Sequence, residues 1–173
     1  MTQVGLISDT HNYLDDAVLQ HFATCDEIWH AGDFGTIAIS ERLKSLTGLP
    51  LRGVYGNIDG NDIRSLYGET LHFTCEEIKV FMKHIGGYPG RYAPGVQKEI
   101  MDHGSQLFIS GHSHILKVMY DDKINCLHIN PGAAGKHGWH TVRTLIRFTI
   151  DKKDIRDCEI IELGNKGNLT HDL

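Results

Sequence analysis

Short apolar runs that end in glycine or polar residues divide the first third of the chain. Residues 2–8, 27–31 and 50–55 are predicted to be buried strands, because each run is short and mostly apolar. The segments 14–25 and 37–46 between them carry apolar residues at the three- and four-residue spacing of helices. Strands that alternate with helices across short turns predict right-handed βαβ units and a parallel sheet.

The pattern changes near residue 69, where predicted strands follow one another closely. Residues 69–75 and 77–83 form a hairpin or an edge pair, and a glycine-rich loop follows at 84–95. A helix at 96–103 leads to a strand at 107–110. Further strands, which the short spacing indicates are antiparallel, are predicted at 116–121, 124–129, 141–150 and 155–163. We therefore predict an α/β fold, a four-layer αββα sandwich of two mixed β-sheets flanked by helices, with residues 1–173 in a single domain.

Composition and charge narrow the class of protein. The chain of 173 residues is 40% hydrophobic, enough for a sizeable core, and no apolar stretch reaches the roughly 20 residues that span a bilayer. A net charge of −5 argues against binding to long nucleic acids. The four cysteines form no C-x-x-C pair and no signal peptide is evident, so we expect reduced thiols in a cytoplasmic protein with a polar tail after residue 164.

Metal-binding residue types directly follow five of the predicted strands. In chain order they are Asp9, His11, Asp33, Asn57, His84, His112 and His114. Side chains two apart in extended backbone point to the same side, which applies to His112 and His114. A lone G-D or G-N pair is usually only a turn. Because all these residues follow strand ends, where sites form in α/β sheets, together they predict one site.

The number and chemistry of these donors predict two cations. Two carboxylates, four imidazoles and an amide exceed what one tetrahedral ion takes, and Asp33 is the natural bridging carboxylate. Mixed oxygen and nitrogen donors without thiolate favour manganese, with zinc, iron, nickel and cobalt as alternatives. Two such ions about 3.5–4 Å apart are the arrangement of phosphatases and nucleases, in which they activate a water molecule.

In order and spacing, these motifs resemble those of the calcineurin-like metallophosphoesterase superfamily. They are D-T-H at 9–11, G-D at 32–33, G-N-I-D at 56–59, a lone His84 and G-H-S-H at 111–114. The resemblance covers nearly the whole chain and is strongest to small stand-alone bacterial and archaeal phosphodiesterases. It implies the same sandwich fold and a phosphodiesterase in which a metal-bridging hydroxide attacks a phosphate ester.

The resemblance also implies how the ligands divide. One metal would take Asp9, His11, Asp33 and His114, and the other Asp33, Asn57, His84 and His112. Asn57 and His112 would also steady the phosphoryl oxygens during catalysis. Many relatives carry a histidine after G-N that protonates the leaving group, but here that residue is Ile58. Asp59 is then either a turn residue or a functional acid, and we expect a preference for good leaving groups such as aryl phosphates.

The loop after His84 carries the predicted substrate-binding residues. Arg91 would clamp a phosphate oxygen, and Tyr92 or Tyr88 would stack on a base or aryl group; the alternative is an ordinary solvated loop. His137 is a weaker candidate of the same kind and a source for the missing proton. The remaining histidines are interpreted as core or surface residues: His21, His30, His72, His103, His128, His140 and His171.

Two other functions stay open from the sequence. A non-enzymatic protein-binding scaffold of the same fold would tend to lose a site histidine, whereas no ligand position is replaced here. A small nuclease would suit short oligonucleotides, although the acidic chain counts against it. The expected partner is a small phosphate-ester substrate, and a homodimer through the strand-rich C-terminal half also stays open.

Overall fold

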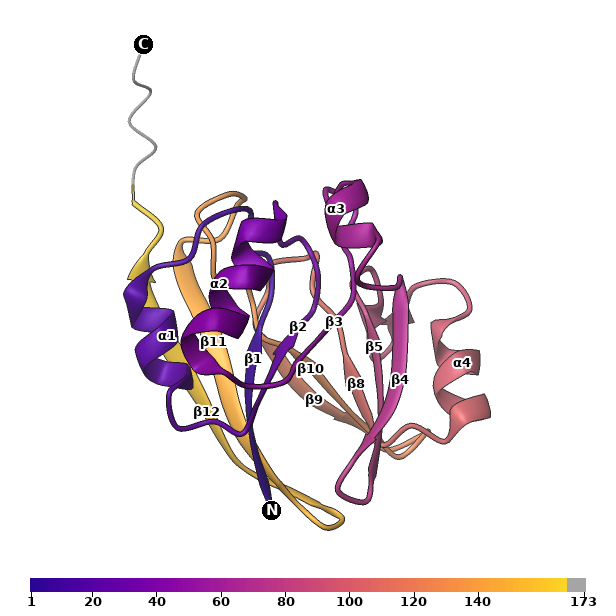
Figure 1. Ribbon diagram of the computed structural model, residues 1–173. Helices are drawn as coiled ribbons and strands as arrows, with labels where there is room; N and C mark the ends of the chain where they lie inside the picture. The colour runs from indigo at the N-terminus through magenta and orange to yellow at the C-terminus, as the bar shows by residue number, and fades with distance from the viewer. Residues whose placement is uncertain (168–173) are drawn as a thin grey trace.

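The computed structural model describes residues 1–167, apart from the side chains at positions 46 and 47, and has two five-stranded sheets packed face to face (Figure 1). The first sheet has the order β12-β11-β1-β2-β3. Its strands are β1 (Thr2–Ile7), β2 (Glu27–His30), β3 (Leu51–Gly53), β11 (Val142–Asp151) and β12 (Asp154–Asn165). As predicted, β1, β2 and β3 are parallel, while β11 joins β1 in antiparallel pairing.

The second sheet has the order β4-β5-β8-β10-β9. Its strands are β4 (Thr70–Cys75), β5 (Ile78–Lys83), β8 (Leu107–Ile109), β9 (Lys117–Asp121) and β10 (Cys126–Asn130). The three central strands are parallel, and β4 and β9 pair with them in antiparallel fashion at the two edges. Both sheets are therefore mixed, as the sequence predicts.

Helices cover the outer face of each sheet, which confirms the predicted αββα sandwich. Helices α1 (Asp16–Phe22) and α2 (Ile37–Thr47) lie on the first sheet, and α4 (Val96–His103) lies on the second (Figure 1). Alternation along β1 sends Leu6 into the core between the sheets and Ile7 into the core under the helices. Gly5 lets α1 approach closely, because a Cβ there would lie 2.5 Å from the Phe22 ring.

Two short elements were not predicted. Helix α3 (Asn61–Arg64) is a single turn after Gly60, too short for an apolar repeat to reveal it. The predicted loop at 84–95 contains a hairpin of β6 (Gly87–Tyr88) and β7 (Arg91–Tyr92), whose two-residue strands carry no recognisable alternation. The predicted stop of the second helix is confirmed, since Gly48 adopts the left-handed conformation there.

Other expectations concern the cysteines, the membrane and the tail. Cys25, Cys75 and Cys126 are buried free thiols, and Cys158 is an exposed one. Within the described part of the chain, no helix has the length and apolar character needed to cross a membrane. Asn165, the first residue of the predicted tail, is the last residue of β12, and residues 166–167 follow it. The rest of that tail, with His171, lies outside the described residues.

Candidate metal centre

The predicted metal ligands meet at one edge of the sandwich, beyond the carboxyl ends of five strands. They form two groups whose ligand atoms lie within 4.8 Å of one another: Asp9, His11 and His114, and Asp33, His84 and His112. The loops after β1 and β2 supply Asp9, His11 and Asp33, and the loops after β5 and β8 supply the other histidines. Each group therefore combines residues from both sheets.

Asp33 lies between the two groups. Its Oδ2 is 3.3 Å from His11 Nε2 in one group and 3.1 Å from His84 Nε2 in the other. The second carboxylate, Asp9, directs Oδ1 toward His114 Nε2 at 3.1 Å. Asn57, the seventh predicted ligand, adjoins the second group, because its Oδ1 is 3.0 Å from His112 Nδ1. Because Asp33 lies close to a histidine of each group, it is the residue that can bridge two cations.

Buried ligand atoms without hydrogen bonds show that the residues fit a metal. Asp9 Oδ1, His11 Nε2 and His84 Nε2 are buried and make no hydrogen bond, although they face one another. Buried polar atoms are normally satisfied, so unsatisfied atoms that converge indicate a missing partner. Carboxylate oxygen and imidazole nitrogen are the donors that first-row divalent metals accept. A pair of such cations would satisfy all three atoms.

The opposite atoms of the same ligands are held by the protein. Asp9 Oδ2 accepts hydrogen bonds from Ser8 Oγ at 2.6 Å and from the His112 backbone N–H at 3.1 Å. The Nδ1 atom of His84 is 2.7 Å from the Ala31 carbonyl oxygen, which requires Nδ1 to carry the proton. Such contacts fix the orientation and the tautomer of a ligand, so His84 presents Nε2 to the centre.

The backbone at the ligands is strained. Asp9, His11, Asp33, His112 and His114 have φ values of 54°, 44°, 57°, 68° and 58°, in the left-handed region that non-glycine residues rarely adopt. Each such residue costs of order 1–3 kcal/mol, and such conformations cluster at functional sites. The strain turns the chain sharply at each strand end so that the side chains converge.

Two glycines leave room for the carboxylates. A Cβ at Gly56 would lie 2.0 Å from Asp33 Oδ1, and a Cβ at Gly111 would lie 2.2 Å from Ser8 Oγ and 2.9 Å from Asp9 Oδ2. These positions therefore tolerate only hydrogen, which accounts for glycine in both the G-N and the G-H-S-H motifs.

Asp59 and His30 brace the ligand loops. The two carboxylate oxygens of Asp59 accept the Gly35 and Gly56 backbone N–H groups at 2.9 and 2.7 Å, which ties the loops after β2 and β3 together. This geometry is that of the turn residue considered from sequence. His30 is fully buried beside the site, as predicted, and bonds Thr10 Oγ1 and the Gly32 N–H.

Opposite charges at the centre shift the pKa values of its ligands. Burial alone would raise the pKa values of Asp9 and Asp33, but the neighbouring imidazoles outweigh it and hold both well below their usual range. Burial alone would lower the pKa of His11, but Asp33 and Asp9 raise it to about 9. Without metal, protonated imidazoles therefore balance the two carboxylates.

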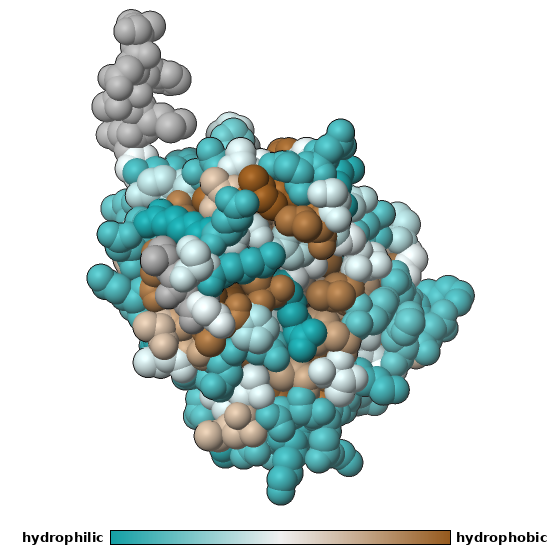
Figure 2. All heavy atoms as spheres, in the orientation of Figure 1, coloured by the Kyte–Doolittle hydropathy of each residue, from teal (hydrophilic) through white to brown (hydrophobic). Residues whose placement is uncertain are grey.

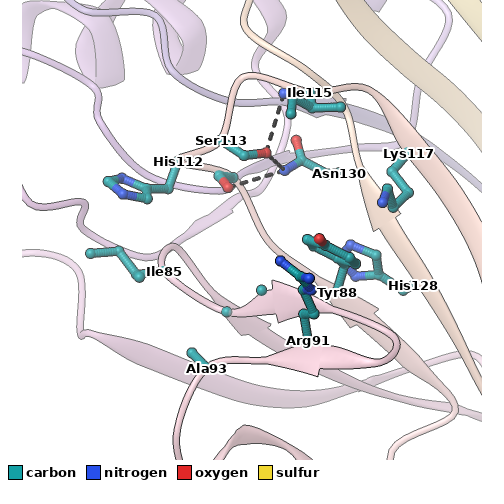
Figure 3. A pocket seen from close by; sticks show the side chains of 13 residues that line it. Ile85, Tyr88, Arg91, Ala93, His112, Ser113, Ile115, Lys117, His128 and Asn130 are labelled. Carbon is teal, nitrogen blue, oxygen red and sulfur yellow. Dashed lines mark hydrogen bonds between the residues drawn. The ribbon is translucent and has the colours of Figure 1, made fainter.

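The predicted substrate-binding residues do not all lie in one place in the structure. Arg91 and Tyr88 line a cavity of about 300 Å³ that begins at His112 (Figure 3). Tyr92 does not line that cavity, because its hydroxyl donates to Asp121 Oδ2 at 2.7 Å and its ring packs on the second sheet. His137 lies on the other side of the centre, where its ring stacks on His11 at 4.8 Å.

The structure brings together two groups of residues that the sequence analysis did not connect. Lys117 and His128 line the same cavity as Arg91, but each is isolated in a strand without a motif. His72, Glu99 and His103 form a third group within 4.8 Å, on the outer face between β4 and α4. The four-residue separation of Glu99 and His103, which places both on one helix face, was the available signal.

Comparisons with known proteins agree with this geometry. A family model described as the calcineurin-like phosphoesterase superfamily domain matches residues 2–153, while no match was found among curated proteins. A solved archaeal phosphodiesterase has a TM-score of 0.74 and 21% identity, over 93% of this chain and 99% of that chain.

Two further solved structures share the fold. A Thermotoga maritima protein has a TM-score of 0.70 and 20% identity, over 94% of this chain and all of that chain (100%). Vps29 from Entamoeba histolytica, solved in complex with zinc, has a TM-score of 0.71 and 15% identity, over 92% of this chain and 98% of that chain.

Proposed function

The chain belongs to the calcineurin-like phosphoesterase superfamily, and on that premise we propose that it is a phosphodiesterase that depends on two divalent metal ions. The position of Asp33 carries this proposal: one carboxylate oxygen lies about equally far from a histidine of each ligand group, at 3.3 and 3.1 Å. A carboxylate so placed can bridge two cations, and paired divalent cations are typical of phosphoryl-transfer hydrolases.

The donor set supports manganese, with zinc, iron, nickel and cobalt as alternatives. Asp9, His11 and His114 would hold one cation, His84, His112 and Asn57 the other, and Asp33 both. Carboxylate, imidazole and amide donors without thiolate suit these metals better than calcium. Zinc, the ion bound by the Entamoeba histolytica relative, is the first alternative to test.

The chain's own residues orient the phosphate. A pair of bound cations supplies positive charge for the phosphoryl oxygens and lowers the pKa of a water molecule. The side-chain nitrogen of Asn57 has no acceptor among the described residues, and its oxygen contacts His112 Nδ1. Asn57 can therefore donate to a phosphoryl oxygen, while the exposed His112 ring forms the border between the ligands and the adjoining cavity.

The residues near the candidate ligands offer no proton to a leaving group, which favours esters whose leaving group departs as a stable anion. Ile58 is 45% exposed and has no proton to give, and both oxygens of Asp59 are already occupied by backbone N–H groups. An aryl oxide leaves as an anion more readily than an alkoxide does. The substrate that this site hydrolyses fastest should therefore have an aryl or similarly acidic leaving group.

A metal-holding protein scaffold is the second candidate. Ile58, Ile85 and Ile115 each directly follow a predicted ligand and are 45%, 44% and 61% exposed. Hydrophobic residues also reach the surface at the upper edge of the molecule in Figure 2, the edge of the ligand loops. Exposed apolar side chains mark protein interfaces. The cavity beside His112 favours the enzyme, because a scaffold needs no substrate pocket.

A substrate panel with metal analysis tests the proposal. Purified protein loaded with manganese or zinc is assayed on bis(p-nitrophenyl) phosphate, p-nitrophenyl phosphate, a cyclic nucleotide and a short oligonucleotide. We expect two metal ions per chain and the highest kcat/KM on the bis-aryl diester. Two bound ions without hydrolysis of any ester would select the scaffold, and preference for the oligonucleotide would select the nuclease.

A further inference from the structure

The cavity beside His112 is lined by cations and by no acid. Arg91 and Lys117 are among its lining residues, and no aspartate or glutamate of the described chain lines it. The protein as a whole has a net charge of −5, so a positive cavity is a local feature. Its volume of about 300 Å³ lies at the lower end of the range for small-molecule sites.

Arg91 has no side-chain partner among the described residues. The other six arginines donate hydrogen bonds to carboxylates or carbonyl oxygens: Arg42, Arg52, Arg64, Arg143, Arg147 and Arg156. Among residues 1–167, only the Arg91 guanidinium has neither a hydrogen bond nor an ion pair. A guanidinium that faces a cavity and is unpaired presents its planar fork to an anion.

Lys117 is held in place without being neutralised. Its ammonium lies 3.7 Å from the centroid of the Tyr88 ring, a cation–π contact that positions the charge and leaves it available. His128, on the same wall, adds no charge near neutral pH, because burial, with a smaller effect from Lys117, lowers its pKa to about 4. The positive charge of the cavity therefore comes from Arg91 and Lys117.

The cavity runs from the metal ligands to these cations. In Figure 3, His112 lies at one end and Lys117 at the opposite end, with Arg91 between them. The lining also includes the apolar Ile85 and the aromatic Tyr88, together with the polar Ser113 and Asn130. A ligand that fills the cavity therefore meets His112 at one end, Arg91 farther along, and Lys117 with the Tyr88 ring at the other end.

A second pocket on the Asn57 side differs in its charges. It has a volume of about 220 Å³ and is lined by His84, Arg64, Lys83 and Glu69. Lys83 lies 4.0 Å from Glu69, and the Arg64 guanidinium donates to the Asp59 carbonyl oxygen. Its two cations therefore each have an oxygen partner in the protein, unlike Arg91 and Lys117.

We infer that the substrate is a phosphodiester with a second phosphate on one substituent, and that Arg91 and Lys117 bind this distal phosphate. The substituent that carries the second phosphate has an aromatic or apolar part, as a nucleoside does, because Ile85 and Tyr88 also line the cavity. This inference rests on the proposed phosphodiesterase function and adds the substrate class to it.

Two matched substrates test the inference. Both are p-nitrophenyl esters of thymidine 5′-phosphate, one with a free 3′-hydroxyl and one with a 3′-phosphate. Hydrolysis adds water across the P–O bond to the aryl group and releases p-nitrophenolate, a proton and the nucleotide. We expect the 3′-phosphate to raise kcat/KM by about 10- to 100-fold, the strength of hydrogen bonds to a charged group.

Alanine variants of the two cations test whether these side chains cause the preference for the 3′-phosphate. Arg91→Ala and Lys117→Ala should each reduce the preference for the 3′-phosphate by about tenfold. Lys123→Ala, an exposed lysine in the β9–β10 turn, is the matched control and should keep the full preference. Hydrolysis of both esters with equal kcat/KM, or a preference that the two variants retain, would overturn the inference while leaving the phosphodiesterase intact.

A binding measurement separates the two proposals. Calorimetric titration of the metal-free protein should show tighter binding of thymidine 3′,5′-bisphosphate than of thymidine 5′-phosphate, and Arg91→Ala should reduce the difference by about tenfold. If neither ester is hydrolysed by the metal-loaded protein, the phosphodiesterase proposal fails, and this titration still decides whether the cavity holds a second phosphate. Equal affinities for the two nucleotides would reject that site.

Discussion

Two regions of the molecule bring histidines and carboxylates together, and they differ in how those side chains are satisfied. At the sheet edge, Asp9 Oδ1 and His84 Nε2 are buried without hydrogen bonds. On the outer face, His72 Nε2 bonds Glu99 Oε1 at 2.9 Å, and the His72 ring stacks on His103 at 3.7 Å. The outer group therefore uses one of its ligand nitrogens within itself and leaves one buried atom, His72 Nδ1, without a hydrogen bond, whereas three such atoms converge at the sheet edge.

The backbone separates the two regions further. The residues of the outer group lie in a regular strand and a regular helix, whereas five ligands of the centre have positive φ. Proximity of metal-binding residue types is thus a weak criterion by itself. Unsatisfied buried atoms and strained turns together distinguish a site built for a ligand from side chains that meet on a surface.

Removing the Asp33 carboxylate, which is proposed to bridge the two cations, should have the largest effect. Asp33→Ala should abolish hydrolysis and lower the metal content of the purified protein from two ions per chain, because both ligand groups lose the same oxygen. Elemental analysis and the bis-aryl phosphate assay measure the two effects. A variant that retains two ions and near-full hydrolysis would show that the regions do not differ as described.

Metal affinity at the centre should rise with pH. In the metal-free protein Asp33 and Asp9 raise the pKa of His11 to about 9, so a cation must displace a proton below that pH. Affinity should increase up to about tenfold per pH unit between pH 6.5 and 9, as measured by competition with a chelator. A flat profile over this range would contradict the charge balance described for the ligands.

The same pKa shift predicts the pH dependence of stability in the metal-free protein. Because the pKa of His11 is higher in the folded than in the unfolded state, its interaction with Asp33 is fully present below pH 6.5. It is lost as the pH rises through 9. Urea unfolding at pH 6 and pH 9.5 should show that the His11→Gln variant loses less stability over this interval than the unsubstituted chain.

A single methyl group should disturb the centre by a smaller amount. Gly56→Ala places a Cβ 2.0 Å from Asp33 Oδ1, so this carboxylate must move, with an expected loss of about 10- to 100-fold in metal affinity. Gly60→Ala, four residues later, is the matched control, because its nearest neighbour is 3.5 Å away. Equal affinities for the two variants would show that the orientation of Asp33 matters little.

The smallest effect is expected in the outer group. His103→Ala should leave the metal content at two ions per chain and change the free energy of unfolding by only about 0.5 kcal/mol, because His103 is an exposed surface residue. Loss of a tightly bound ion in this variant would place a third metal on the helix face and remove the distinction between the regions.

The fold was largely predictable because its signals are repeated along the chain. Parallel strands β1 to β3 leave short apolar runs, and the helices between them leave an apolar stripe, so neither depends on one residue. Helix α3 and the β6–β7 hairpin were missed because elements of two to four residues have no period. The register of β10 beside β8 is likewise set by tertiary packing, which the local pattern does not contain.

The convergence of the candidate ligands was predictable for a different reason. Each of them follows a strand end, and parallel strands bring their carboxyl ends to one edge of each sheet. Substrate residues do not obey such a rule: Arg91 and Tyr92 are adjacent, yet in a strand neighbours point to opposite sides, and only Arg91 reaches the cavity. Lys117 reaches it from β9, a strand with no motif to mark it.

Each ligand group takes residues from both sheets, so a bound cation would connect the two sheets. A cation held by Asp9 and His114, or by Asp33 and His84, would be a noncovalent crosslink between segments that are about a hundred or fifty residues apart. The hydrophobic layer holds the two sheets along their faces, and such a crosslink would join them at one end. Removing bound metal with a chelator should therefore loosen the ligand loops of both sheets. Backbone amides at the carboxyl ends of β1 and β8 should then exchange with deuterium together.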